Sequence, residues 1–264
     1  MIRIAPRRSR VGRLDPSTLH EDNAPHELEI TKPFYLSAAE VTVNQFQDFL
    51  KSSRDSSTIL DREQLEPDPA VSPTGDHPMQ RVSWRDAALF CNWLSERENL
   101  RPRYQIRPKD SENTTAEEIT IDAEANGYRL PTEGEWEFAC RAGTTTDYFF
   151  GNDIQLLKSY GAFSNSKKMT AAVSSDLLPN RNGLTGMHGN VWEWCEDWWS
   201  NLDGTSLTDP LGPDQPNSNR PNRVFRGGGV STMSGEPNSG SRGNAPPNTR
   251  YSNLGFRIAR PVER

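Results

Sequence analysis

The stretch from Gly183 to Trp199 reads GLTGMHGNVWEWCEDWW and holds four of the seven tryptophans in this 264-residue chain. Trp192 and Trp194 lie two residues apart, so a strand at this place sends both indoles to one face. That face must be core. Three glycines precede the strand, and they predict a loop whose backbone folds tightly. The stretch therefore predicts a tight turn that leads into a buried strand.

The same loop has a second interpretation as a cation site. A glycine-rich loop can turn its carbonyl groups toward a common point, and Glu193 adds a carboxylate just after it. Calcium takes carbonyl and carboxylate oxygens as ligands, so such a loop could enclose this ion. Composition alone favours the tight turn, and both interpretations stay open at this point.

The bulk composition excludes several classes of protein. Hydrophobic residues make up 33% of the chain, and the mean hydropathy is -0.81. The 19 glycines and 20 prolines favour a soluble, loop-rich fold over a helical bundle. No run approaches the roughly 18 apolar residues that a membrane helix requires. The net charge of -6 gives no general case for a nucleic-acid partner, so we expect neither a membrane span nor nucleic-acid binding.

The N-terminus departs from this acidic balance. The first thirteen residues, MIRIAPRRSRVGR, carry five arginines and lack the apolar segment of a secretory signal peptide. A basic arm that contacts phosphates is one interpretation, and a solvated terminus is favoured. We therefore expect residues 1–25 to be a separate basic segment and residues 26–264 to form a single domain. The cellular compartment stays open.

Cysteine and histidine spacing gives no sign of a disulfide framework or a zinc site. Cys91, Cys140 and Cys195 are an odd number and form no CxxC pair. The four histidines are scattered and form no HExxH motif. We expect Cys91 and Cys140 to be small core residues, because each falls on the apolar stripe of a predicted helix.

Three helices are predicted from capping residues followed by apolar stripes. Thr42 and Thr132 open capping boxes, and Ser83 is an N-cap. Short alternating segments predict strands between these helices. The expected strands are His26–Ile30, Tyr104–Ile106, Ile119–Ile121, Arg223–Arg226 and Leu254–Ala259. The long polar segments that remain predict irregular structure.

Six motifs occur in an order that resembles the formylglycine-generating enzyme, or sulfatase-modifying factor, family. They are EVTVNQFQDF, HPMQRVSWRDAALFCNWL, GYRLPTEGEWEFACRAGT, NGLTGMHGNVWEWCEDWW, RVFRGGG and NLGFRIAR. The resemblance covers residues 26 to 260. It implies a single α+β domain related to C-type lectins, with little regular secondary structure. It also implies that the natural start, or an upstream partner domain, is missing from this sequence.

The family's namesake activity oxidises a cysteine of a sulfatase peptide to formylglycine, with O2 and a copper(I) ion held by two cysteines. Two thiolates suit this soft ion. The matching interval here, residues 229 to 257, contains no cysteine, and Gly229 replaces the serine of the family's GGS motif. We therefore expect no copper and assign no catalytic residue.

The resemblance also bears on calcium. In the family, the loop offers backbone oxygens at positions that match Met187, Gly189 and Val191, while Asn190 and Glu193 remain as side-chain candidates. Gly186 stands where the family has Asp or Asn, which removes one ligand. A structural calcium ion therefore stays an expectation, with affinity weakened by the lost charge.

A binding module is the favoured function, with a peptide or protein as its ligand. The polar segment from Ser231 to Asn253 has the adaptable chemistry of recognition surfaces. The candidate contact residues are Ser231, Thr232, Ser241, Arg242, Asn244, Arg250, Tyr251 and Asn253. For Arg242, a structural role is favoured over ligand contact.

Two enzymatic alternatives remain. One is cysteine oxidation by a changed site with Cys195 as a lone thiol, although the carboxylates of Glu196 and Asp197 disfavour a thiolate there. The other is a different enzymatic activity on the same fold, as in the family's iron-dependent sulfoxide synthase. That enzyme takes its iron ligands from a histidine-bearing helical domain, which this sequence lacks, so we expect no such iron site here.

Overall fold

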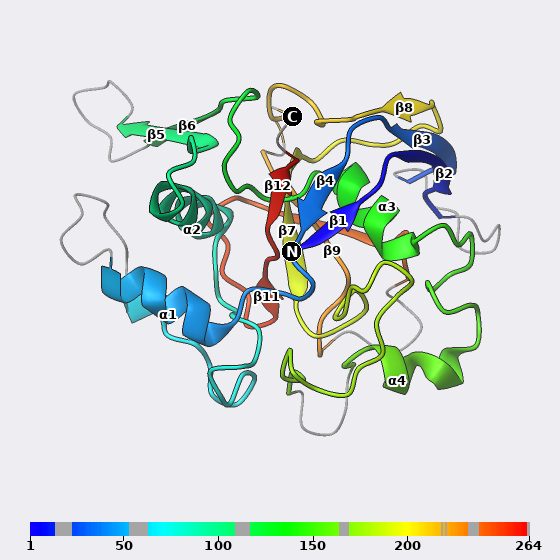
Figure 1. Cartoon of the computed structure of the whole chain (residues 1–264), viewed down its shortest axis with the longest axis horizontal. Helices are drawn as coiled ribbons and strands as arrows, with labels where there is room; N and C mark the ends of the chain where they lie inside the picture. The colour runs from blue at the N-terminus through cyan, green and yellow to red at the C-terminus, as the bar shows by residue number, and fades with distance from the viewer. Residues whose placement is uncertain are drawn as a thin grey trace.

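The tryptophan-rich stretch forms β7 (Trp192–Trp198), the strand at the centre of the molecule (Figure 1). The computed structural model describes residues 1–13, 23–52, 63–108, 117–163, 169–217, 219, 221–231 and 238–262. β7 pairs antiparallel with β9 (Arg223–Arg226) and parallel with β11 (Leu254–Gly255), and β10 (Arg242–Ala245) extends the sheet beyond β9. The predicted strand is therefore an interior strand of a four-stranded sheet.

β7 is buried on both faces and separates two cores. Trp192 and Trp194 share one face, as predicted, and both rings contact Phe225, at centroid distances of 5.1 and 5.6 Å. This face packs toward α1 (Val43–Ser52) and α2 (Trp84–Arg97). The other face carries Cys195 and packs toward α3 (Glu133–Arg141). Figure 1 shows α1 and α2 on one side of β7 and α3 on the other.

The three predicted helices begin at their predicted capping residues. Thr42 and Gln45 exchange the two hydrogen bonds of a capping box before α1. Ser83 with Asp86 and Thr132 with Glu135 form the same motif before α2 and α3. The shorter helical elements are α4 (Leu157–Tyr160) and the 3-10 turns η2 (Glu63–Leu65) and η3 (Ile154–Leu156). Among the described helices, none is long and apolar enough to cross a membrane.

Two three-stranded sheets and a hairpin complete the fold. One sheet has the order β1 (Ile2–Ile4), β4 (Phe34–Leu36), β12 (Ala259–Pro261). The other has the order β2 (Arg7–Val11), β3 (His26–Ile30), β8 (Leu207–Thr208). The two strands predicted near residues 104 and 119 are present as β5 (Tyr104–Pro108) and β6 (Glu117–Ile121), and they pair antiparallel as a hairpin. The mixture of few helices and many short strands confirms the α+β class.

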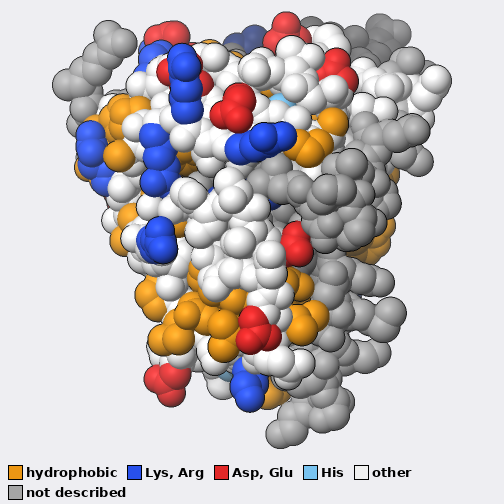
Figure 2. All heavy atoms as spheres, turned by 90° about the vertical axis from the view of Figure 1, so that its right-hand side faces the viewer, with side chains coloured by type: hydrophobic (Ala, Val, Ile, Leu, Met, Phe, Trp, Pro, Cys, Tyr) orange, Lys and Arg blue, Asp and Glu red, His pale blue; other side chains and the backbone are white. Residues whose placement is uncertain are grey.

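The basic N-terminal arm differs from the solvated segment that we expected. Ile4 and Val11 are buried, because β1 pairs with β4 and β2 pairs with β3. The arginines of β2 are exposed, although the guanidinium of Arg7 lies over the ring of Phe138. Basic side chains gather on the upper part of the face in Figure 2, the side of the molecule on which β2 and β3 lie in Figure 1. β1 and β2 are edge strands of their sheets, and each buries its last residue while its arginines stay exposed.

The predicted last strand, Leu254–Ala259, is divided in two. β11 ends at Gly255 beside β7, and β12 begins at Ala259 in a different sheet. The residues between them cross from one sheet to the other, with the carbonyls of Phe256 and Ile258 bonded to Val41 N and Ser37 N. All six residues are buried, so the predicted alternation of exposed and buried side chains was wrong here, and the sequence pattern could not show this crossing.

Arg257, in the middle of that crossing, forms a bidentate ion pair with Glu193 of β7. The Nε–Oε2 and Nη2–Oε1 distances are 2.6 and 2.8 Å, and neither side chain is exposed to solvent. Trp136 of α3 donates its indole N–H to the same carboxylate at 2.6 Å. Arg257 also donates to the carbonyls of Ser37 and Thr185. One ion pair thus joins the central strand, α3 and the C-terminal crossing.

We expect Glu193→Gln to lower the free energy of unfolding by about 3–5 kcal/mol, because it leaves a buried guanidinium without its counter-charge. Urea unfolding followed by tryptophan fluorescence measures this change. The matched control is Glu29→Gln in the exposed Arg8–Glu29 pair, which should change stability little. Equal effects of the two substitutions would contradict the role given to the buried pair.

Candidate functional site

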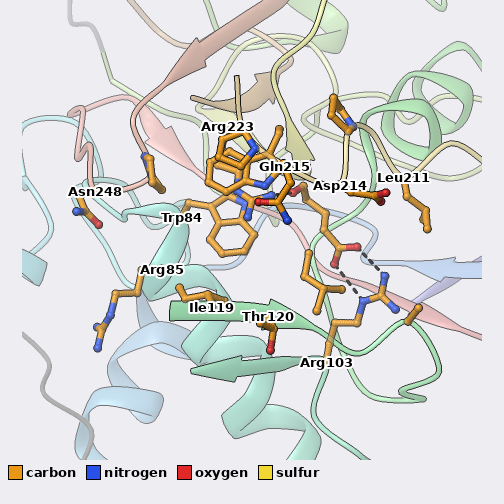
Figure 3. A pocket seen from close by; sticks show the side chains of 17 residues that line it. Trp84, Arg85, Arg103, Ile119, Thr120, Leu211, Asp214, Gln215, Arg223 and Asn248 are labelled. Atoms are coloured by element: carbon orange, nitrogen blue, oxygen red, sulfur yellow. Dashed lines mark hydrogen bonds and ion pairs between the residues drawn. The ribbon is translucent and has the colours of Figure 1, made fainter. Parts of the chain in front are cut away.

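A cleft with a volume of about 950 Å³ lies where the C-terminal end of β7 meets α2 (Figure 3). One wall is β6 of the hairpin, and another is the proline-rich loop from 211 to 216. Pro247 and Asn248, from the segment predicted to recognise a ligand, form part of the rim. The volume falls in the upper part of the range of ligand sites, roughly 300–1,000 Å³.

The floor of the cleft is an arginine held between two tryptophans. The guanidinium carbon of Arg223 lies 3.4 Å from the ring centroid of Trp198 and 4.0 Å from that of Trp84. Trp84 is fixed by its position as the first residue of α2 and by an indole N–H that donates to the carbonyl of Cys195 at 2.8 Å. Cation–π contacts on both faces hold the guanidinium in place.

Arg223 is exceptional among the buried arginines in the described part of the chain, because no carboxylate pairs with it. The others each have one: Arg103 with Glu196, Arg129 with Glu135, Arg141 with Glu137, Arg226 with Glu133 and Glu137, and Arg257 with Glu193. Arg223 donates one hydrogen bond to the carbonyl of Glu196, and its Nε has no partner. Burial lowers the pKa of this guanidinium to about 10. The nearby charges of Glu196 and Asp197 oppose this lowering of the pKa, but neither carboxylate forms an ion pair with the guanidinium.

The other walls combine a neutralised ion pair with apolar lips. The Glu196 carboxylate accepts two hydrogen bonds from Arg103, at 2.7 and 3.2 Å, and one from the Tyr104 hydroxyl at 2.9 Å. Its charge is thus taken within the protein. Leu211 and Ile121, on different walls, are 57% and 37% exposed. Such large exposed apolar side chains beside a cleft are typical of ligand sites.

Of the predicted recognition residues, Ser231, Tyr251 and Asn253 lie at the surface or partly exposed. The hydroxyl of Ser231 accepts a hydrogen bond from the Asn253 side chain at 2.6 Å, and Tyr251 is 51% exposed. Thr232 lies outside the described residues. None of the seven described residues lines the cleft, although Pro247 and Asn248 of the same segment do.

The remaining predicted residues are engaged within the fold. Ser241 is buried and bonds with Asn238, whereas the partly exposed Asn244 accepts a hydrogen bond from Asn222. Arg242 donates to both oxygens of Glu133, and its guanidinium lies 4.1 Å from the centroid of the Trp199 ring. Arg250 forms an ion pair with Asp86 at 2.9 Å. The structural role favoured for Arg242 matches these contacts.

All three cysteines are buried, each in a different element. Cys91 lies in α2, Cys140 in α3 and Cys195 in β7. The prediction that Cys91 and Cys140 are core residues is therefore confirmed. Burial raises the pKa of the Cys140 thiol to about 12 and holds the pKa of the other two thiols well above the usual range. For Cys195 the charge of Asp197 acts in the same direction. All three are protonated thiols at neutral pH.

The predicted calcium loop has its side-chain oxygens in other contacts. Both oxygens of Glu193 accept from Arg257, and one also accepts from Trp136. The amide oxygen of Asn190 accepts from Ala171 N at 2.7 Å. Glu193 therefore does not fit as a calcium ligand in this arrangement, since a guanidinium lies against it. The backbone at Met187, Gly189 and Val191 is left as the predicted ligand set. Across the described residues, no three His, Cys, Asp or Glu side chains are grouped to hold a metal ion.

A second carboxyl, that of Glu40, lies against this loop. A side chain at Gly186 would collide with the Glu40 carboxyl, so the glycine leaves the space that this group fills. Burial, with the charge of Glu193, raises the pKa of Glu40 from 4.5 to about 8, and Arg257 opposes the shift only in part. One oxygen of this carboxyl has no hydrogen-bond partner. Sequence reasoning missed Glu40, because it lies far from the loop along the chain.

The sequence model of one protein family, the sulfatase-modifying factor enzyme 1-like domain, matches residues 1–262. The chain belongs to this family. Among its relatives, the formylglycine-generating enzyme of Mus musculus is 30% identical over 209 residues, which cover 73% of this chain and 46% of the mouse protein. Chaperone protein LppX of Paenibacillus barcinonensis is 28% identical over 221 residues, or 74% of this chain and 69% of that protein. This family member thus spans less than half of the mouse enzyme's length.

Solved structures show the same family fold. Treponema denticola variable protein 1 superposes with a TM-score of 0.80 and 30% identity, covering 99% of this chain and 95% of that one. PvdO from Pseudomonas aeruginosa superposes with a TM-score of 0.74 at 22% identity, covering 98% and 93% of the two chains, and this likeness shows the fold alone. The family fold predicted from the six motifs is confirmed.

Calcium at the loop stays a prediction, and its expected effect is on stability. An ion that binds the folded chain alone raises the melting temperature, so saturating calcium should raise it relative to chelator. Differential scanning calorimetry measures the difference. Glu40→Gln, which removes the neighbouring carboxyl, should reduce it. A melting temperature that is unchanged by calcium would contradict the prediction.

Glu40 also predicts a pH dependence in the absence of calcium. Its pKa is about 8 in the folded chain and near 4.5 when unfolded, so the folded state retains a proton that the unfolded state loses between these values. Stability should therefore fall as pH rises through this window. Urea midpoints measured across the window should fall less in Glu40→Gln than in the unchanged chain. The same pH dependence of the urea midpoint in both proteins would contradict the assignment of this effect to Glu40.

Proposed function

We propose that this chain is a ligand-recognition member of its family that does not form formylglycine by the copper route. The state of the three thiols carries this proposal. They lie in α2, α3 and β7, are fully buried, and are held protonated by burial. A copper(I) site of the family type needs two adjacent thiolates. The fold offers no two cysteines for this role.

The cleft supports recognition as the alternative use of the fold. Its lining comes from several segments that lie far apart in the sequence, and the arginine on its floor is held between two indoles. Tryptophan and arginine are the residues that contribute most to binding energy at interfaces. The expected ligand is a peptide or protein segment.

Some relatives contain a domain like this chain as a small part of a longer protein, and this supports an accessory role. Serine/threonine-protein kinase Pkn1 of Chlamydia trachomatis is 34% identical over 192 residues, which are 71% of this chain but only 25% of that protein. A domain of this type is thus combined with other segments in a related chain. We propose that this chain also acts together with a partner domain, and that its own cleft recognises the ligand.

The test is incubation of the full chain with copper, a reductant, O2 and a peptide that carries the sulfatase Cys-x-Pro-x-Arg pattern. Mass spectrometry follows the peptide cysteine. We expect no aldehyde, because no thiolate pair can bind the ion, while mouse formylglycine-generating enzyme serves as the positive control.

Aldehyde formation would overturn the proposal. In that case Cys195→Ser would show whether the lone thiol acts, with the equally buried Cys91→Ser as the matched variant.

A further inference from the structure

We propose that the cleft binds a peptide segment in which a carboxylate lies between apolar side chains, and that Arg223 receives this carboxylate. The inference rests on the proposed recognition function and names the chemistry of its ligand. Three features support it: the missing counter-charge of Arg223, the balance of the other charges, and the apolar lips.

The missing counter-charge argues for an anionic ligand. Each of the other buried arginines in the described part of the chain meets a carboxylate, so the fold pairs such cations consistently. A buried cation without a partner is costly. Arg223 has only 3% exposure and lines the cleft. A carboxylate brought by a ligand would complete the pairing through the planar guanidinium, which favours this group.

The other charges of the cleft leave this preference in place. The Glu196 carboxylate is bound by Arg103 and is therefore neutralised within the wall. Asp214 is exposed at the rim, where water screens its charge. Arg85 lies at the opposite part of the rim in Figure 3. Among the buried charged residues of the lining, Arg103 and Glu196 pair with each other, and Arg223 is left without an ion pair.

The apolar lips argue for a peptide with apolar side chains on both sides of the carboxylate. Leu211 and Ile121 belong to different walls, the proline-rich loop and β6, and 57% and 37% of their surfaces are exposed to solvent. Burial of both lips at once requires apolar groups that reach outward in two directions from a carboxylate on the floor. A glutamate between two apolar residues has this arrangement.

The test uses short capped peptides, each with one glutamate between leucine, isoleucine or phenylalanine residues, and each matched by the same peptide with glutamine. Titration of the full chain, followed by tryptophan fluorescence and calorimetry, gives the dissociation constants. The glutamate peptides should bind at least about ten-fold more tightly than the glutamine peptides, as a charge-assisted hydrogen bond predicts.

Surface variants provide the controls. Leu211→Asp places a like charge on an exposed lip and should remove the preference for glutamate, without a folding cost. Leu178→Asp, at a leucine that is 48% exposed and outside the cleft, should leave binding unchanged. Arg223→Gln should abolish the preference and Arg223→Lys should restore part of it, with circular dichroism to confirm that both variants fold.

Several outcomes would overturn the inference: equal binding of the glutamate and glutamine peptides, no binding of any peptide, or an unchanged preference in Leu211→Asp. Competition by inorganic phosphate at equal concentration would show a general anion site and overturn the peptide assignment. Equal binding of both peptides in the cleft would still leave recognition in place. The copper assay tests formylglycine formation separately, so its result does not depend on any of these binding measurements.

Discussion

The buried ion pair between Glu193 and Arg257 is the interaction on which the rest of this structure depends. Glu193 lies in the central strand and also accepts a hydrogen bond from Trp136 of α3, whereas Arg257 donates to the carbonyls of Ser37 and Thr185 as well. A buried pair of this kind adds little net stability compared with apolar residues of the same volume. Its hydrogen bonds, however, require a specific arrangement of both side chains and of the carbonyls of Ser37 and Thr185. We infer that it fixes the position of the C-terminal crossing against β7, and with it the division into two cores.

The same rule of complete pairing separates the scaffold of this protein from its candidate site. Buried arginines of the scaffold meet carboxylates within the chain, and their charges cancel. Arg223 instead lies between the rings of Trp84 and Trp198, which hold the cation but do not neutralise it. The departure occurs beside the large cleft, where a ligand can supply the missing charge. We infer that a buried arginine with a purely structural role would have paired with a carboxylate of the chain.

This chain has the family's fold, and its three cysteines are buried. Its three cysteines fill core positions, where a small apolar side chain packs well and a thiolate is disfavoured. The loop before β7 shows a similar change. Its glycine at 186 makes room for the carboxyl of Glu40, and the carboxylate of Glu193 serves the ion pair. In both regions the side chains that could bind a metal ion make structural contacts instead.

The sequence by itself determined the helix starts, the central strand and the family, because these depend on local signals. A capping box such as Ser83 with Asp86 spans three residues, and the alternation of Trp192 and Trp194 spans two. The crossing between Gly255 and Ala259 and the membership of the cleft were decided only by the tertiary structure. Neither the crossing nor the cleft has a local sequence signal. The two apolar lips of the cleft come from segments about 90 residues apart. Arg223 lacks an ion pair because the carboxylates near it bond to other groups. Pairing and charge balance are properties of neighbours in space, so they become visible only when distant segments meet.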